Sequence, residues 1–94
     1  MPFFTYMLRS ADGSYYTGHT DDLDLRLAQH AKGSFGGYTA RRRPVELVWS
    51  ESFPTRDAAF TTERQVKGWS RAKKEALIAG DWDRIRQLAR NRAA

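Results

Sequence analysis

Apolar and aromatic residues predominate in three short stretches of the chain, and each stretch predicts a β-strand. Residues 3–10 and 15–19 enclose the turn-forming stretch 11–14, which contains an Asp-Gly pair. Asp-Gly between two apolar runs is a strong signal for a tight hairpin, so the first two strands should pair antiparallel. Residues 45–53 are rich in β-branched and aromatic side chains and predict a third strand.

A helical pattern follows the hairpin. Residues 20–22 offer a hydroxyl and two carboxylates, which suit the N-terminus of a helix. We expect this helix to continue to about Lys32 and to end at Gly33. Apolar residues one turn apart should form its inward face: Leu23, Leu27 and Ala31.

A loop and a second helix are expected on either side of the third strand. Residues 34–43 contain glycines and arginines and precede Pro44, so we expect a basic loop there. Pro54 and Thr55 should begin a helix that runs to about Trp69. Its inward stripe should consist of Ala58, Ala59, Thr62, Val66 and Trp69.

Two more helices are expected near the C-terminal end, a short basic one over residues 71–79 and a last one over residues 81–92. A hairpin, a helix, a strand and then helices predict an α+β fold with a small, largely antiparallel sheet. At 94 residues the chain should form a single domain over residues 1–94. Its core should lie at about residues 4–79, with a basic helical extension at residues 80–94.

Composition excludes several kinds of protein. The chain has no cysteine, which excludes disulfide scaffolds, thiolate zinc sites and cysteine nucleophiles. The first residues lack the basic region and long apolar run of a signal peptide. No apolar stretch approaches the roughly 18 residues needed to span a membrane. We therefore expect a cytoplasmic protein without a membrane partner.

The net charge suggests an anionic partner. Lys and Arg exceed Asp and Glu by 16 to 11, which gives a formal net charge of +5. The excess is concentrated from Arg71 onward, with a second cluster at residues 41–43. Nucleic acid would explain this distribution. Basic side chains that only keep exposed helices soluble would explain it as well, because +5 is ordinary for a small domain.

Arg26 and His30 are the first candidates for chemistry. They lie four residues apart on the first predicted helix, so their directions differ by about 40° and both flank its apolar face. Both could reach the edge of the sheet. Alternatively, Arg26 is a surface charge near Asp22, and His30 is an ordinary residue stabilised by the C-terminal end of the helix dipole.

Glu63 lies at the border of the apolar stripe of the second predicted helix. It could pair with Lys67 four residues later, an arrangement that contributes about 0.2–0.5 kcal/mol. It could instead bind Mg²⁺ or Mn²⁺, with water and phosphate oxygens as the other ligands. The residues alone leave both possibilities open.

The two predicted hairpin strands carry tyrosines and one glycine of interest. Tyr6 and Tyr16 could be ordinary strand residues, because tyrosine is common in strands. Tyr15 and Tyr16 are adjacent and must face opposite sides of their strand, so only one of them can face the first helix. Gly18 in mid-strand is more informative, since glycine there often marks a bulge or a close approach.

The order and spacing of these residues resemble the GIY-YIG endonuclease domain, from about Phe4 to Ile78. The residues that carry the resemblance are Tyr6-Met7-Leu8, Tyr16-Thr17-Gly18, Thr20, Leu23, Arg26-Leu27, His30, Gly33, Thr39, Glu46-Leu47-Val48 and Glu63. The stretch after Glu63 is similar to a small stand-alone bacterial subgroup that contains little beyond this module. The triplets that name the family differ here, with Thr5 before Tyr6 and Thr17 in place of isoleucine.

The resemblance implies a three-stranded antiparallel sheet flanked by helices. It also implies a metal-dependent DNA endonuclease that hydrolyses phosphodiester bonds in DNA repair or processing, without a strict requirement for one DNA structure. Five side chains would line one cleft: Tyr6, Tyr16, Arg26, His30 and Glu63. Glu63 would bind a single Mg²⁺ or Mn²⁺ ion, and Arg26 would contact the phosphate.

The resemblance also implies that a tyrosine accepts the proton of the attacking water, and Tyr6 is the first candidate. A free tyrosine has a pKa near 10 and is almost entirely protonated at neutral pH, so Tyr6 needs another group to act as a base. Either Arg26 and the metal lower the pKa of Tyr6, or His30 accepts the phenolic proton as the tyrosine accepts that of water. Tyr16 would orient the water or the phosphate.

Basic side chains outside the cleft would hold the nucleic-acid backbone: Arg41, Arg42, Arg43, Lys67, Arg71, Lys73 and Lys74. The expected partner is duplex, branched or single-stranded DNA, and RNA is not excluded. An accessory protein could position the substrate, and the protein should be a monomer or a weak dimer. The alternative is a non-catalytic DNA- or RNA-binding module with the nuclease fold. A small interaction module with incidental charge is a third interpretation.

Overall fold

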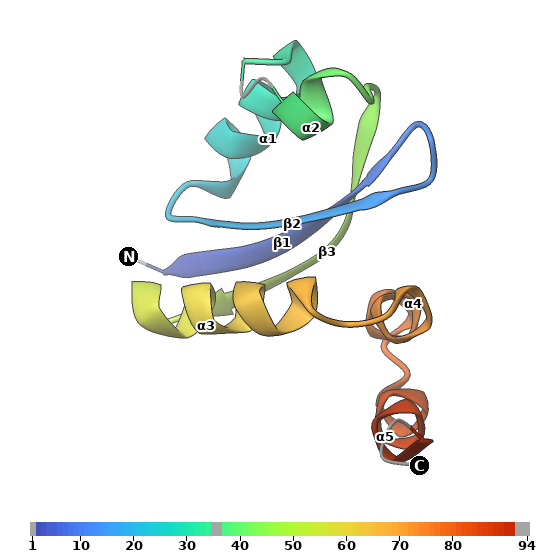
Figure 1. Cartoon of the computed structure of the whole chain (residues 1–94). Coiled ribbons are helices and arrows are strands. Elements are labelled where there is room, and N and C mark those ends of the chain that lie inside the picture. The colour runs from blue at the N-terminus through green and yellow to red at the C-terminus, as the bar shows by residue number, and fades with distance from the viewer. Residues whose placement is uncertain (1, 35–36, 92–94) are drawn as a thin grey trace.

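The computed structural model describes residues 2–34 and 37–91 and shows an α+β fold (Figure 1). A three-stranded sheet is flanked by helices which, apart from the short α2, follow the order predicted from the sequence. The elements are β1 (Phe3–Ser10), β2 (Tyr15–Thr20), α1 (Leu23–Lys32), α2 (Gly37–Ala40), β3 (Val45–Phe53), α3 (Arg56–Lys67), α4 (Arg71–Ala79) and α5 (Trp82–Asn91). The predicted bounds of β1, β3 and α4 are confirmed without change.

The sheet has the order β2-β1-β3, and both pairings are antiparallel. The hairpin therefore places β1 in the centre and leaves β2 as an edge strand. In the register of the hairpin, Tyr6 lies opposite Gly18 and Leu8 lies opposite Tyr16. Because side chains alternate along a strand, Tyr6 and its neighbour Thr5 face opposite layers.

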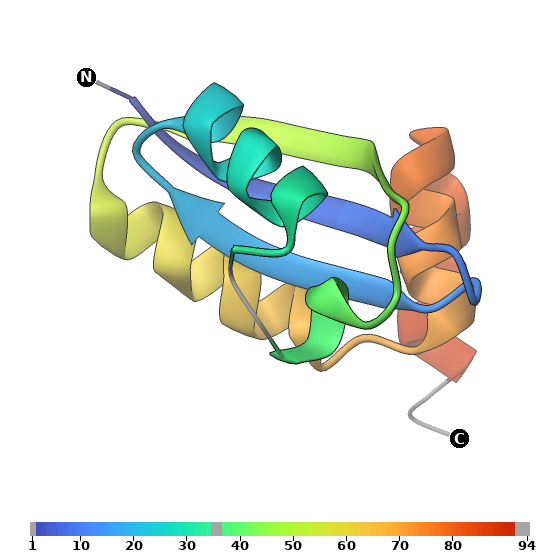
Figure 2. The ribbon, with the colours of Figure 1, turned by 90° about the horizontal axis from the view of Figure 1, so that it is seen from above.

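Helices cover both faces of the sheet. Figure 1 shows α1 and α2 on one face and α3 on the other, with α5 beyond α4. Seen from above, α3 lies under the β2 edge and extends past it (Figure 2). The Thr5 hydroxyl donates a hydrogen bond to the Ala59 carbonyl oxygen at 2.7 Å, which attaches α3 to the central strand.

Local capping explains where the helices begin and end. The Asp22 carboxylate accepts from the Leu25 N–H, and the Thr55 hydroxyl accepts from the Ala58 N–H, both at 3.1 Å. The predicted capping roles of these residues are thus confirmed. Gly33 has a φ of 75°, a conformation that favours glycine, and it ends α1 as expected. The end expected for α3 at Trp69 is wrong, because the helix ends at Lys67 and Gly68 forms its C-cap.

The segment at residues 34–43 differs from the expected loop. It contains the short helix α2, while residues 35 and 36 lie outside the described part of the chain. Thr39 in α2 is almost completely buried and makes a side-chain contact with His30 of α1. A tertiary contact of this kind cannot be read from local propensity, which explains why the sequence predicted a loop.

The inward face of α1 also differs from the expected one. Leu23 and Leu27 are half-buried, but Ala31 is exposed and its neighbour His30 is buried in its place. The apolar periodicity therefore predicted the correct side of the helix, but not the residue at the centre of its buried face. The last helix begins at Trp82, and its expected end at residue 92 lies outside the described residues.

The hydrophobic core lies between the sheet and the C-terminal helices. Its buried members come from four elements: Met7, Val66, Ala76, Leu77 and Ile85. Trp69 packs against this cluster, and Ile85 attaches α5 to it. Among the described residues, no helix has the length and apolarity that crossing a bilayer would require.

Gly18 should be a position where even one methyl group is not tolerated. A Cβ built there would lie 2.6 Å from the Tyr6 hydroxyl oxygen, and Tyr6 is fully buried and cannot move aside easily. We expect Gly18→Ala to lower the free energy of unfolding by about 1–3 kcal/mol in urea titrations. In the control Gly68→Ala, the new Cβ would approach the Gln65 carbonyl oxygen only to 3.6 Å, so stability should change little. Wild-type stability of Gly18→Ala would contradict this packing.

Candidate active site

Tyr6 lies at the centre of a polar cluster under α1. Its side chain is fully buried, and its hydroxyl oxygen is 2.9 Å from Nε2 of His30. The absence of a side chain at Gly18 on the neighbouring strand provides the space for the Tyr6 hydroxyl. The close approach that the mid-strand glycine indicated is therefore made by a tyrosine of the proposed site.

His30 connects Tyr6 to α2. Its imidazole is almost completely buried, and its Nδ1 lies 2.8 Å from the Thr39 hydroxyl oxygen. Burial, followed by the positive charge of Arg26, lowers the pKa of His30 below its ordinary value. A neutral imidazole with one nitrogen held by Thr39 can accept a proton at the other nitrogen.

Tyr16 and Arg26 complete the cluster on this face of the sheet. The Tyr16 ring centroid is 5.2 Å from that of His30 and 6.4 Å from that of Tyr6. Arg26 of α1 is half-buried, and its charge lies near enough to Tyr6 to lower the pKa of that hydroxyl. The structure thus brings together four of the five side chains proposed for the cleft, and Arg26 is not merely a surface charge near Asp22.

The surroundings of Tyr6 bear on its role as a base. Burial is the main cause that raises the pKa of its hydroxyl well above the ordinary value, and the nearby Tyr16 contributes to the rise. Arg26 acts in the opposite direction, as expected, but its effect is smaller than that of burial. Burial therefore disfavours the route through a free Tyr6 phenolate.

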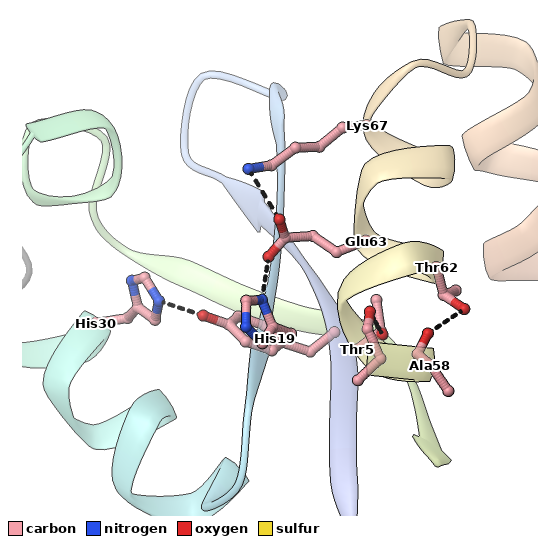
Figure 3. Close-up of polar contacts among 9 residues, drawn as sticks. Thr5, His19, His30, Ala58, Thr62, Glu63 and Lys67 are labelled. Atoms are coloured by element: carbon pink, nitrogen blue, oxygen red, sulfur yellow. Dashed lines mark hydrogen bonds and ion pairs between the residues drawn. The ribbon is translucent and has the colours of Figure 1, made fainter. Parts of the chain in front are cut away.

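Glu63 comes from the opposite layer of the fold. It is only 7% exposed, so it lies within the buried face of α3 and not at the border expected for it. Its Oε1 is 2.8 Å from Nδ1 of His19, and its Oε2 is 3.3 Å from Nζ of Lys67 (Figure 3). The Lys67 pairing considered above is therefore present. The charge of Glu63 is also a minor cause of the raised pKa of Tyr6.

His19 and Thr39 contact the candidate site residues but were given no role from the sequence, although Thr39 is one of the residues that carry the family resemblance. His19 alternates with Gly18 along β2 and therefore faces α3, on the side of the strand opposite to the one that Gly18 faces. Tyr15 lies on the same side of β2 as His19, and its hydroxyl donates a hydrogen bond to Glu75 of α4 at 3.1 Å. The period of two was a usable signal for His19. For Thr39, the signal was its place among the residues that resemble the family.

A divalent ion would have few protein ligands at this site. The described residues contain no group of three or more acidic, histidine or cysteine side chains that could hold a metal. Glu63 offers one carboxylate, which is a suitable donor for Mg²⁺ or Mn²⁺ when water and phosphate oxygens supply the other ligands. The donor set therefore fits a weakly held ion, provided that the Lys67 ammonium leaves Oε2.

The three consecutive arginines have different surroundings. Arg41 is exposed, whereas the Arg42 side chain donates to an Asp12 carboxylate oxygen at 3.0 Å and stacks on the Tyr38 ring. Arg43 donates to the carbonyl oxygens of Ala40 and Ala31 at 3.2 and 3.4 Å. These two arginines stabilise the segment around α2 in addition to any role at a phosphate.

The basic residues of α4 also have intramolecular partners. Arg71 donates to the Gly13 carbonyl oxygen at 2.9 Å and pairs with Glu75. Lys73 lies over the Trp69 ring at 4.4 Å from its centroid. Burial lowers the pKa of the half-buried Lys74. All three remain candidates for contacts with a nucleic-acid backbone.

The structure is that of a small α+β domain with a buried Tyr–His pair, an adjacent arginine and a single carboxylate near an edge strand. The family model for the GIY-YIG catalytic domain matches residues 2–76. The chain therefore belongs to the GIY-YIG family. Its resemblance to this family, inferred above from individual residues, is confirmed.

Relatives of similar length support this assignment. A UPF0213 protein of Natronomonas pharaonis is 44% identical over 78 residues, which cover 83% of this chain and 92% of that protein. The solution structure of a UPF0213 protein from Bacillus halodurans is 43% identical, covers 84% of both chains and has a TM-score of 0.55. A protein from E. faecalis, also solved by NMR, is 35% identical with a TM-score of 0.60 and 85% coverage of both chains. These relatives are thus small proteins with little beyond the domain.

The lowered pKa of His30 predicts a specific dependence of stability on pH. An unfolded histidine has a pKa of about 6.5, so below this pH the unfolded chain binds a proton that the folded protein does not. The contribution of His30 should be fully present above about pH 6.5 and should be lost as the pH falls through its folded pKa. In urea titrations from pH 7.5 to 5, His30→Gln should therefore show a weaker decline in stability than the wild type. Equal declines would contradict the assignment.

Proposed function

We propose that this protein is a metal-dependent endonuclease that hydrolyses phosphodiester bonds of DNA during repair or processing in the cytoplasm. The observation that carries the proposal is the hydrogen-bonded series Tyr6–His30–Thr39, with Arg26 beside it, in a member of a nuclease family. A buried tyrosine bonded to a neutral histidine is more than packing requires, because an apolar residue would fill the same space without a polar partner.

In the proposed mechanism, Tyr6 accepts a proton from the attacking water while its own proton passes to Nε2 of His30. The oxygen of the water forms a bond to phosphorus, and the bond from phosphorus to the leaving oxygen breaks. This transfer avoids a free phenolate, which burial disfavours. Thr39 accepts from Nδ1–H and so keeps Nε2 available as the acceptor.

Arg26 and Tyr16 act on the phosphate. The planar guanidinium of Arg26 can contact two non-bridging oxygens and offsets the charge that develops on them. Tyr16, whose ring packs against His30, orients the attacking water or the phosphate. Both side chains lie beside the proton-transfer pair, so positioning and proton transfer would occur at the same point of the proposed site.

Glu63 is the proposed ligand of a single Mg²⁺ or Mn²⁺ ion. When bound, this ion supplies Lewis-acid stabilisation of the phosphate and its leaving oxygen. The protein contributes the carboxylate and its position near the β2 edge. One protein ligand is compatible with Mg²⁺, which commonly keeps several water molecules and binds substrate phosphates.

A cleavage panel tests the proposal. Labelled duplex, nicked, branched and single-stranded DNA, together with an RNA of the same sequence, are incubated with Mg²⁺ or Mn²⁺ and with EDTA. A nuclease produces metal-dependent fragments. Retarded migration on a native gel without any cleavage would favour the non-catalytic nucleic-acid-binding module. The absence of both cleavage and retardation would favour an interaction module. The panel also identifies the preferred substrate.

Two substitutions in the cleft should abolish most of the cleavage. Glu63→Gln keeps the size of the side chain but removes its charge, and Arg26→Ala removes the phosphate contact. Each should lower the rate by about 100-fold or more, the usual effect of removing one group that stabilises the transition state. Arg9→Ala is a matched control, because the exposed Arg9 pairs with Glu46 on β3. Cleavage at the wild-type rate by either folded cleft variant would refute its assigned role.

The salt dependence of DNA binding can show which of the basic residues contact the nucleic-acid backbone. If all three consecutive arginines contacted phosphates, their loss would flatten the log–log salt slope of duplex binding by roughly 2–3 units. Because Arg42 and Arg43 have intramolecular partners, we now expect Arg41→Gln alone to flatten the slope by about 0.9 units. Arg43→Gln should leave the slope unchanged and instead lower stability. A change with Arg43→Gln and none with Arg41→Gln would contradict these assignments.

A further inference from the structure

We propose that His19 and Lys67 hold the two oxygens of Glu63 in different ways, one as a permanent positioning partner and the other as an exchangeable counter-ion. On this proposal, a divalent ion displaces Lys67 from Oε2, and the released ammonium then binds a phosphate of the nucleic acid. Metal binding and nucleic-acid binding would therefore strengthen each other. The inference rests on the proposed function, in which Glu63 binds the metal.

His19 has the features of the permanent partner. Its Nδ1 lies 2.8 Å from Oε1 of Glu63, and its side chain is 25% exposed. The imidazole packs against Phe60 of α3, with the ring centroids 5.2 Å apart. The strand β2 and the ring of Phe60 thus determine where its N–H points. A group that orients a metal-binding carboxylate through a hydrogen bond typically changes metal affinity 10- to 100-fold when removed.

Lys67 has the features of the exchangeable partner. Its Nζ is 3.3 Å from Oε2, and its side chain is 53% exposed, while that of Glu63 is only 9% exposed. The pair lies four residues apart on one helix, an arrangement that is weak and sensitive to salt. Figure 3 shows Lys67 and His19 approaching the carboxylate of Glu63 from different sides. A cation can therefore replace Lys67 without displacing His19.

The exchange has a consequence for the nucleic acid. Without metal, the Lys67 charge is used to neutralise Glu63 and contributes little to phosphate binding. With metal at Oε2, the same charge lies one helical turn from the ion, where phosphate oxygens of the substrate are expected. By thermodynamic linkage, nucleic acid must then tighten metal binding by the same factor by which the metal tightens nucleic-acid binding.

The first arm of the test measures Mn²⁺ binding to the DNA-free protein by electron paramagnetic resonance. Lys67→Gln should bind Mn²⁺ about two- to fivefold more tightly, because the competing ammonium is gone. His19→Phe keeps a ring against Phe60 but lacks the donor, and it should bind roughly tenfold more weakly. His19→Asn restores an N–H donor and should recover most of the affinity. Unchanged Mn²⁺ affinity in Lys67→Gln or in His19→Phe would overturn the proposal.

The second arm measures the salt dependence of binding to a nicked duplex, in a Tyr6→Phe background that prevents cleavage. With saturating Mn²⁺, Lys67→Gln should flatten the log–log slope by about 0.9 units, and with EDTA it should leave the slope unchanged. The control Arg84→Gln on α5 also removes one positive charge. Its effect on the salt slope should be the same with Mn²⁺ and with EDTA. Equal effects of Lys67→Gln with and without metal would show that Lys67 does not exchange, and would overturn the proposal.

The variant Glu63→Gln separates this inference from the proposed function. If Glu63→Gln binds Mn²⁺ as tightly as the wild type, Glu63 is not the metal ligand and the proposed function itself fails. If Glu63→Gln loses Mn²⁺ binding but Lys67→Gln behaves like the wild type in both arms, only the exchange fails.

Discussion

The hydrogen bond between the Tyr6 hydroxyl and Nε2 of His30 is the interaction on which the arrangement of the site depends. It joins the central strand to α1 across the interior, and both side chains are buried. It also accounts for two of its neighbours. Gly18 must lack a side chain to leave room for the hydroxyl, and Thr39 must supply a partner for the second imidazole nitrogen. A buried polar pair is stable only when each of its members has such a partner.

The same burial determines what chemistry the pair can perform. Because burial raises the pKa of Tyr6 and lowers that of His30, both groups stay neutral near pH 7. In this neutral pair, the Tyr6 hydroxyl can donate its hydrogen bond to Nε2 of His30. Arg26 opposes the rise of the Tyr6 pKa only in part, so its charge does not offset the effect of burial.

The sequence was most informative where local rules decide the structure. The strands follow from apolar alternation and the Asp-Gly turn, and the helix starts follow from Asp22 and Thr55, whose side chains cap them. These features depend on neighbours within a few residues. The order and spacing of the tyrosines and the glycine, together with the family resemblance, were sufficient to place the candidate cleft at the hairpin and α1.

The sequence was less informative where distant segments decide the structure. The burial of His30 in place of Ala31 depends on Tyr6, and α2 depends on the contact that Thr39 makes with His30. The pairing of His19 with Glu63 joins residues 44 positions apart. No local propensity contains these contacts, although the alternation along β2 did point His19 toward α3.

The protonation of the His30 ring tests the central claim most directly. Long-range ¹H–¹⁵N correlation spectra of the ¹⁵N-labelled protein at pH 7 distinguish the two neutral tautomers from imidazolium. The account predicts the tautomer with the proton on Nδ1, with Nε2 as a bare acceptor of the Tyr6 hydroxyl. A proton on Nε2, or a doubly protonated ring at this pH, would contradict it.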